Sequence, residues 1–537
     1  MAIRKVAAAA ATGTLGSETV ETVDRVPMKT WICVIGVLIG CFLAVLNIVV
    51  TNSSLRDIAG TLAASSDEIS WVPTSYLVAE IVVIPLTAWL SSAFSLKKYL
   101  LVNSALFALF SVFCGQAHSL QLMIFFRVVQ GFTGGVLIPL SFDVILTYLP
   151  TSKQAIGMAL FTVTATFAPA IGPLIGGWLT DNYGWPFIFY MNAIPAALMI
   201  AIVWFTMEDQ PMNLPLLKKG DWWGILTMAI GLAAFEIVLE DGNRKDWFGD
   251  TGIVKLAWTA AVFIPAFIII ELRGQGPLVD LRLFARRNFG LGSIVNIVLG
   301  IGLYGVVFIL PLYLGQMHGY NASQIGTVLI WLGLPQLLVI PLVPKLMQVV
   351  DTRMIIGIGI LLFGGSCFLN IHLDSDFAGP QFYFPLIIRA LGQPLIMVPL
   401  SAFSTSGMSK GRESGAASAL FNMMRNIGGS IGIAGLSTLL SIRERFHSER
   451  VGESVTLYSI AAQERLQQSA AYFLAMGSDS YTANMRAVGA LGGAVRRQSF
   501  LFAYADCFLA LGCVLLASAA ALLFMKKTKV SGPIGGH

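Results

Sequence analysis

Long runs of uncharged, apolar residues recur along almost the whole chain. A helix needs about 20 such residues to cross the hydrocarbon core of a bilayer. The sequence offers about fourteen stretches of that length and character, between residues 30 and 525. Only 12% of the 537 residues are charged, whereas soluble domains carry about 25%. The chain is therefore expected to be an all-α integral membrane protein.

The bounds of the expected spans are approximate, because pattern alone places the end of a helix only to within a few residues. They lie near 30–51, 71–92, 98–117, 120–148, 155–179, 185–206, 222–240, 253–271, 289–313, 323–347, 353–371, 382–404, 414–440 and 499–525.

Lysine and arginine residues gather in the loops on one side of these spans, and such loops are typically cytoplasmic. The opposite side offers little beyond Arg56, Arg244, Lys245 and Lys255. An even number of spans puts both termini on the basic side, so we expect both to be cytoplasmic. The residues on that side are Lys97, Lys98, Lys153, Lys218, Lys219, Arg273, Arg282, Arg286, Arg287, Lys345, Arg353, Lys410, Arg412, Lys526, Lys527 and Lys529.

A short motif occurs twice, once in each half of the chain. The fourth span contains Arg127-Val-Val-Gln130-Gly131 and ends near Pro-Leu-Ser at 139–141, whereas the twelfth contains Arg389-Ala-Leu-Gly-Gln393 and ends near Pro-Leu-Ser at 399–401. Repeats of this kind are typical of transporters whose binding site lies between two related helical halves.

Several motifs together resemble the major facilitator superfamily, and specifically its fourteen-span drug:proton antiporter branch of the EmrB/QacA type. The resemblance runs from about Phe42 to Asp506. The motifs that carry it are Asn52, Ser70–Tyr76, Ile84–Leu90, Arg127–Gly131, Pro169–Gly177, Trp185 with Ile188–Asn192, Asp246–Phe248, Asp280–Phe284, Ala417–Asn422 and Arg425–Ser430.

The resemblance implies a major facilitator fold that exports small molecules by alternating access, driven by inward proton flow. It also implies two six-helix bundles with two extra spans between them. We therefore expect bundles at 29–206 and 289–525, linking helices at 207–288, and cytoplasmic tails at 1–28 and 526–537. The polar segment 441–498, between the last two spans, is expected to be a partly helical extracytoplasmic loop, serving either as a spacer or as a docking surface.

The fifth span carries two prolines and several glycines within three turns. Proline removes a backbone donor and glycine weakens a soluble helix, but small residues let helices approach closely in a membrane. Pro169, Gly172, Pro173, Gly176 and Gly177 resemble the family's antiporter motif. They predict a close helix seam at the moving interface of the halves.

Proton coupling is assigned to buried ionisable groups. The family usually has an acid in the first span, where this chain has Asn47, which cannot release a proton. A carboxyl group in hydrocarbon is costly when charged, so it is a functional candidate by default. Glu80 and Asp143 are the proposed proton carriers, with Arg127 as counter-charge; we expect Glu236 and Asp506 to be structural or gating groups.

Residues of mixed character are expected to line a substrate cavity. Ligand sites are mostly apolar with a few orienting polar groups, and methionine and aromatic side chains can repack around different ligands. Arg389 and Arg425 are cations inside spans of the second half, where they would either meet an anionic substrate or pair with backbone groups. The candidates are Asn47, Tyr76, Gln130, Tyr304, Arg389, Gln393, Asn422 and Arg425.

We expect a transporter and not an enzyme, with no metal, cofactor or nucleic acid bound. The sequence has no phosphate-binding loop, so ATP drive is not expected. The leading interpretation is multidrug efflux across the cell (inner) membrane. The alternatives are export of a narrower metabolite, such as a siderophore, phenolic acid or fatty acid, and a non-transporting sensor or scaffold. In a host with two membranes, the resemblance implies an EmrA-like periplasmic adaptor and an outer-membrane channel.

Overall fold

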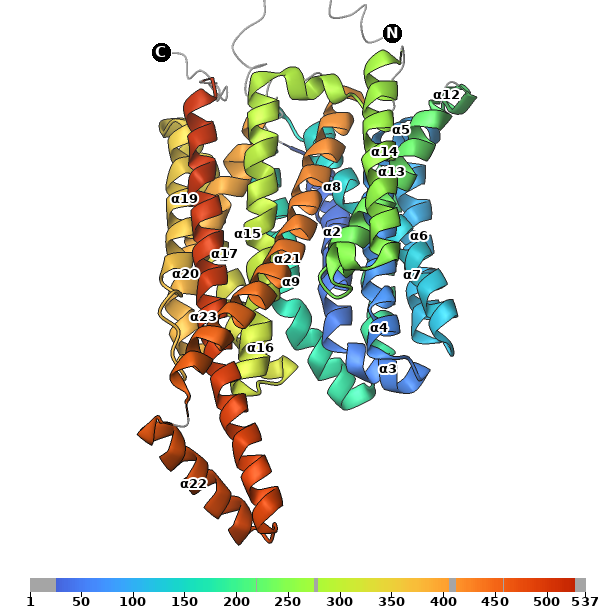
Figure 1. Cartoon of the computed structure of the whole chain (residues 1–537). Helices are drawn as coiled ribbons and strands as arrows, with labels where there is room; N and C mark the ends of the chain where they lie inside the picture. Colours follow the sequence, from blue (N-terminus) through green and yellow to red (C-terminus); the bar gives the residue numbers. More distant parts are fainter. Residues whose placement is uncertain (1–25, 219, 275–278, 405–411, 457, 527–537) are drawn as a thin grey trace, which may run out of the picture.

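The computed structural model describes residues 26–526, apart from 219, 275–278, 405–411 and 457. The two expected tails lie outside the described residues, except for residues 26–28 and Lys526. The regular structure of the described residues is entirely helical (Figure 1). The first long helix begins, and the last one ends, at the same end of the bundle, which we call the termini end.

Twelve helical segments of the described chain are long and apolar enough to cross a membrane. A further apolar helix, Thr352–Phe368, is shorter, with 17 residues. The remaining expected span, 414–440, lies in a helix made more polar by Asn422, Arg425 and Asn426. The helices therefore agree with the expected all-α fold and its spans, and the chain is a multi-pass membrane protein.

The first part of the described chain, from residue 26 onward, forms seven long helices and three short ones. Their bounds are α2 (Met28–Ser53), α3 (Leu55–Leu62), α4 (Ser66–Ile69), α5 (Trp71–Phe94), α6 (Leu96–Gly115), α7 (Leu120–Gly134), α8 (Leu137–Tyr148), α9 (Thr151–Tyr183), α10 (Phe187–Tyr190) and α11 (Ala193–Thr206). Of these, α7 and α8 together make one span.

Two antiparallel helices follow, and the rest of the chain forms the second group of spans. The bounds are α12 (Pro215–Lys218), α13 (Trp222–Asp241), η1 (Trp247–Gly249), α14 (Thr251–Arg273), η2 (Leu281–Ala285), α15 (Arg287–His318), α16 (Ala322–Gly333), α17 (Gln336–Val339), η3 (Ile340–Leu342), α18 (Val343–Val349), α19 (Thr352–Phe368), α20 (Gly379–Ser404), α21 (Arg412–Ser454), α22 (Ile460–Ala475) and α23 (Ser480–Phe524).

Local sequence explains where the turn between α15 and α16 falls. Gly319 ends α15 with a φ of 67°, in the left-handed region that glycine adopts without strain. Asn321 then caps α16 by accepting a hydrogen bond from the Gln324 amide at 2.9 Å, while the Asn321 amide donates to the Gln324 side chain at 3.0 Å. This reciprocal capping box satisfies backbone donors that the helix start leaves free.

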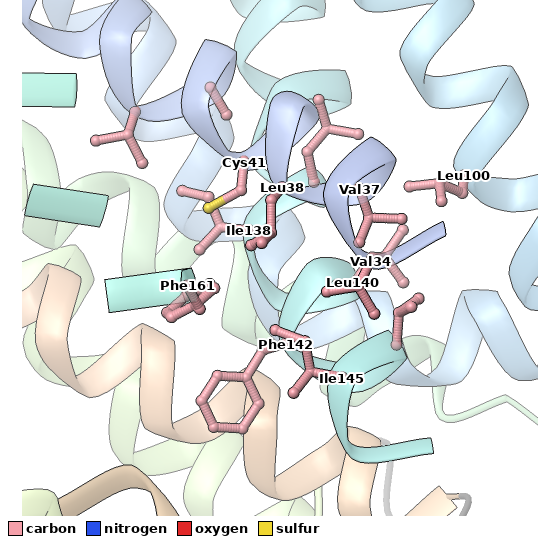
Figure 2. Close-up of a cluster of buried hydrophobic side chains, with 14 of the residues drawn as sticks. Val34, Val37, Leu38, Cys41, Leu100, Ile138, Leu140, Phe142, Ile145 and Phe161 are labelled. Carbon is pink, nitrogen blue, oxygen red and sulfur yellow. The ribbon is translucent and has the colours of Figure 1, made fainter. Parts of the chain in front are cut away.

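Most buried apolar residues of each group of spans form a cluster of their own, although the first cluster also includes second-group residues such as Ile340 and Val398. Figure 2 shows part of the first cluster, where Val34, Val37 and Cys41 of α2 lie beside residues of α8 such as Ile138 and Ile145. Phe142 and Phe161 meet there edge to face, with ring centroids 5.4 Å apart. Lipid tails are as apolar as these side chains, so close packing, more than exclusion of water, holds such helices together.

The segment between the last two spans is almost continuously helical. α21 runs on to Ser454, and α23 starts at Ser480, so that α22 and the first turns of α23 project beyond the bundle opposite the termini end (Figure 1). Hydrogen-bonded polar and charged side chains join α21 to α23 at the base of this projection. Asp506 of α23 accepts a hydrogen bond from Arg443 of α21 at 2.5 Å, and His447 lies 2.7 Å from the same oxygen.

Candidate functional site

The motif helix α9 lies between the two halves. Its Gly172 and Gly176 face α2, because a Cβ on Gly172 would lie 3.3 Å from Val49 and one on Gly176 would lie 2.8 Å from Val50. On the other side, α9 packs against α16 of the second half. A Cβ on Gly177 would lie 2.5 Å from the Cβ of Ala322. The small residues therefore permit two close helix contacts at once.

Glycines of the second half complete this seam. A Cβ on Gly326 of α16 would lie 2.7 Å from the Cα of Leu174, and a Cβ on Gly333 would lie 2.6 Å from the ring of Phe167. A hydrogen bond from Thr166 to Gln336, 2.8 Å long, joins α9 to α17, the short helix that follows α16. The halves are therefore closed together along α9 at the end opposite the termini.

The halves also touch near the termini end, through α8 and α21. Ser418 donates a hydrogen bond to the carbonyl of Pro139 at 3.2 Å. The rings of Phe142 and Phe421 have centroids 6.4 Å apart. Contacts on both sides leave the space between the halves occluded.

A cavity of about 20 Å³ lies in that occluded space. Residues of both halves line it, including Thr166 and Pro169 of α9. Four predicted substrate residues also line it: Tyr304, Arg389, Gln393 and Arg425. The cavity has room for about one water molecule, so a larger ligand needs the halves to separate.

Arg389 presents free donor groups at this cavity. Its Nη2 donates to the carbonyls of Gly302 at 3.3 Å and Leu303 at 3.2 Å, and its guanidinium stacks 4.6 Å from the ring of Phe363. Its Nε and Nη1, although buried, have no hydrogen-bond partner among the described residues. Buried donors without partners are costly, so the site suits a ligand that brings an acceptor or a negative charge.

Asn422 does not line the cavity itself, but it is hydrogen-bonded to Arg425, which does. Its Oδ1 accepts a hydrogen bond from Arg425 at 2.9 Å, and its Nδ2 donates to the Ser418 carbonyl at 2.9 Å. Asn422 therefore orients the Arg425 side chain.

Three other predicted cavity residues belong instead to a polar network inside the first half. Asn47 donates to Asn192 at 2.9 Å, and Gln130 donates to Asn47 at 3.2 Å. Tyr76 donates to the carbonyl of Ala44 at 3.2 Å. Asn47, Gln130 and Tyr76 are all fully buried, and none of them lines the central cavity. Hydropathy does not distinguish these three residues from cavity-lining ones, because a polar residue in a span has the same pattern whichever neighbour it faces.

Arg127 anchors this network. It donates to Gln130 at 2.8 Å and to the carbonyl of Val72 at 3.1 Å, and it stacks 4.3 Å from the ring of Tyr76. Arg389 of the repeated motif also combines backbone carbonyls with an aromatic ring. The repeat seen in the sequence therefore corresponds to a repeated local arrangement. Within the described part of the chain, Arg127 makes no ion pair with a carboxylate.

The two predicted proton carriers lie in different places. Glu80 of α5 is 2% exposed and accepts a hydrogen bond from Asn426 of α21 at 3.2 Å. Asp143 of α8 is partly buried at the contact with α21 and accepts a 3.4 Å hydrogen bond from Thr147. A Cβ on Gly415 would lie 3.6 Å from its carboxylate oxygens.

Glu80 lines a second cavity, of about 40 Å³, together with two other glutamates. These are Glu236 and Glu240 of the linking helix α13. Glu236 is expected from the sequence to be a structural or gating group, and Glu240 is not among the predicted residues. Their spacing of four residues, which puts both on one helix face, was the available signal. Tyr304 lines this cavity as well as the central one.

Two packed groups of membrane helices with a closed polar cavity between them define a membrane transporter. The family model of the Major Facilitator Superfamily matches residues 37–433. The chain belongs to this superfamily.

Curated relatives match most of the chain. The colistin resistance protein EmrB of Acinetobacter baumannii is 32% identical over 95% of this chain and 99% of its own length. The fatty acid resistance protein FarB of Neisseria gonorrhoeae is 31% identical over 92% of this chain and 96% of its own length. The multidrug export protein EmrB of Escherichia coli K12 is 31% identical over 81% of this chain and 85% of its own length.

Solved structures support the fold alone. The proton:xylose symporter XylE is 13% identical with a TM-score of 0.58, over 94% of this chain and 98% of its own. The human organic anion transporter MFSD10 is 14% identical with a TM-score of 0.54, over 90% of this chain and 99% of its own.

Proposed function

We propose that the protein is a secondary active exporter of small amphipathic compounds that works by alternating access. The observation that carries this proposal is the occluded cavity between the halves, bordered by the glycine-rich seam of α9. Six-helix units at 29–206 and 289–525 rock about the cavity, while 207–288 links them. Relatives named for multidrug export and for colistin resistance support this substrate range.

A narrower substrate is favoured by one specific observation. The unpartnered Nε and Nη1 of Arg389 offer an anion two donors at a cavity that polar and apolar side chains both line. A carboxylate with an apolar tail fits this chemistry, and the relative named for fatty acid resistance agrees with it. Export of a fatty acid, phenolic acid or siderophore is therefore the second candidate function. A sensor or scaffold would bind such compounds without flux.

Proton coupling is proposed to rest on Glu80. A buried carboxyl group is stable when neutral and costly when charged. Protonation of Glu80 therefore favours the closed contact with α21, whereas proton loss favours hydration and separation of the helices. Asp143, at the α8–α21 contact, is the second candidate carrier, and Arg127 acts through the polar network of the first half.

We place the protein in the cell inner membrane with both termini cytoplasmic. The basic loop residues support this orientation, because cytoplasmic loops are enriched in lysine and arginine. Arg287 and Arg353 lie at the termini end, where they donate hydrogen bonds to the carbonyls of Phe524 at 2.5 Å and Met525 at 3.1 Å. The α22–α23 projection is then extracytoplasmic, where it could dock an EmrA-like adaptor that leads to an outer-membrane channel.

Flux measured in proteoliposomes tests the proposal. Purified protein is reconstituted, a pH gradient is imposed, and the movement of ethidium and of laurate is followed separately. Gradient-dependent flux of both compounds supports broad export, and flux of laurate alone supports the narrower function. Binding of either compound without any flux would favour the scaffold.

A further inference from the structure

The linking helix α13 has a polar stripe facing the second half. Glu236, Glu240, Asn243 and Trp247 are four, three and four residues apart, the spacing of one helix face continued into the following turn. The stripe begins beside Glu80, which lines the same cavity as Glu236 and Glu240, and follows α13 away from the termini end toward η1.

Helix α21 has a matching polar stripe. Ser430 donates a hydrogen bond to Glu236 at 2.7 Å. Farther along, Asn243 donates to Ser437 at 2.7 Å, and Trp247 donates to Thr438 at 3.0 Å. Apolar packing would hold these helices without placing carboxyl groups in hydrocarbon, and carboxyl groups there are costly, so they are functional candidates by default.

The cavity at the inner end of this interface has unsatisfied acceptors. The Oε2 atoms of Glu80 and Glu236 are buried and have no hydrogen-bond partner among the described residues, and each side chain is 2% exposed. A cavity of about 40 Å³ has room for two or three water molecules. These oxygens are therefore positioned to receive protons or hydrogen bonds from water.

Burial is lower at the outer residues of the stripe than at its start. Glu80 and Glu236 are buried, whereas Glu240, Asn243 and Trp247 are half-buried. Arg244 and Lys245, which follow α13 but do not belong to the stripe, are exposed. Polar groups thus continue from the buried Glu236 to the exposed turn that follows α13.

We propose that the α13–α21 interface is a proton access path, in which Glu240 and Glu236 pass protons between water at the end opposite the termini and Glu80. A proton binds the Glu240 carboxylate from water, moves through cavity water to Glu236, and then to Glu80, each donor returning to its anionic form. This inference rests on the proposed function, in which Glu80 carries the coupled proton.

Other charged and titratable groups act on this path. The positive charges of Arg425 on α21 and Arg127 on α7 interact electrostatically with the Glu80 carboxyl group. Tyr304 of α15 lines the cavity. At the outer end of the proposed path, the charges of Asp241 and Arg244 interact electrostatically with Glu240. The single carboxylate of Asp241 is paired there with two cations, Arg244 at 3.0 Å and Lys245 at 3.6 Å.

The test compares two modes of transport in proteoliposomes that contain the full chain. Uptake driven by a pH gradient needs net proton movement, whereas counterflow, the exchange of labelled for unlabelled laurate, does not. The variants are Glu236→Gln, Glu240→Gln, Glu236→Asp and Glu80→Gln, with Glu208→Gln on an exposed loop as matched control.

We expect Glu236→Gln and Glu240→Gln to slow gradient-driven uptake by on the order of tenfold or more, while counterflow stays within about twofold of the control. Glu236→Asp, which keeps the carboxyl group, should recover most of the uptake. Wild-type uptake in both Gln variants, together with loss in Glu80→Gln, would overturn the path and leave the proposed function standing. An equal fall in counterflow would also overturn it, by showing a structural role. Unchanged uptake in Glu80→Gln would reject the proposed coupling itself.

Discussion

Asn426 of α21 donates a 3.2 Å hydrogen bond to Glu80 of α5 and so joins the two halves of the protein inside the membrane. The bond connects the carboxyl group proposed to carry the proton with a helix that must move during transport. Arg425, the neighbour of Asn426, lines the central cavity. One helix segment therefore meets both the proton site and the substrate site, which is the arrangement that coupling requires.

Placing an acid at position 47 should weaken the protein without improving transport. Asn47 donates to the Leu43 carbonyl at 3.1 Å and to Asn192 at 2.9 Å, and an ionised aspartate donates neither bond. We expect Asn47→Asp to lower stability by about 1–3 kcal/mol and to leave gradient-driven uptake no faster than in the wild type. Thermal unfolding in detergent micelles measures the first effect, and Asn52→Asp, at an exposed site of the same helix, is the control. Faster uptake in Asn47→Asp would contradict this account.

Closing of the α9 seam should depend on the absence of a side chain at Gly326. A Cβ there would lie 2.7 Å from the Cα of Leu174, so one of the two helices must shift. We expect Gly326→Ala to destabilise the occluded state by about 1–3 kcal/mol and to lower both the Tm and the transport rate. Gly365→Ala is the matched control, because nothing lies within 4 Å of a Cβ at that position. Equal Tm values for the two variants would rule out a close seam.

Arg389 should select for negatively charged ligands. Arg389 lines the central cavity and its Nε and Nη1 have no hydrogen-bond partner among the described residues, and a hydrogen bond to a charged group contributes about 1.5–3 kcal/mol. We therefore expect Arg389→Gln to weaken laurate binding by on the order of tenfold or more and to change ethidium binding little. Isothermal titration with each ligand measures this, with Arg56→Gln on an exposed helix as control. Equal losses for both ligands would indicate that Arg389 only supports the fold.

The α22–α23 projection should be needed for partner binding and not for transport. Tyr472, Met476 and Tyr481 are 60%, 66% and 75% exposed there, far more than apolar side chains inside the bundle. Replacing residues 455–479 with a short glycine-serine linker should leave flux in proteoliposomes intact and abolish capture of an EmrA-like adaptor. Adaptor binding that survives the replacement would remove this projection as the docking element.

The spans could be predicted well because crossing a bilayer demands long apolar helices whatever the tertiary contacts are. Which polar residues meet depends on helix rotation, which hydropathy does not report. Tyr304 and Arg389 do line the central cavity, whereas Asn47 and Gln130 bond to each other across two helices of one half. The rotation of α13 about its own axis likewise turns Glu236 toward Ser430 instead of toward lipid.

The partnership of α13 and α21 was the hardest feature to foresee. In the sequence, α13 stands between the halves and looks peripheral, and each of its acids looks isolated. Only the spacing of Glu236 and Glu240, continued by Asn243 and Trp247, indicates one buried polar face. Identifying the facing helix required three-dimensional information, since Ser430 lies 194 residues along the chain from Glu236.

Substrate-dependent proton flux tests the central claim most directly. Proteoliposomes are loaded with a pH-sensitive dye, a gradient of laurate or ethidium is imposed, and the internal pH is followed for the wild type and for Glu80→Gln. The account predicts that substrate movement drives a pH change in the wild type, and that Glu80→Gln loses this change while still exchanging labelled for unlabelled substrate. An undiminished pH change in Glu80→Gln would contradict the account.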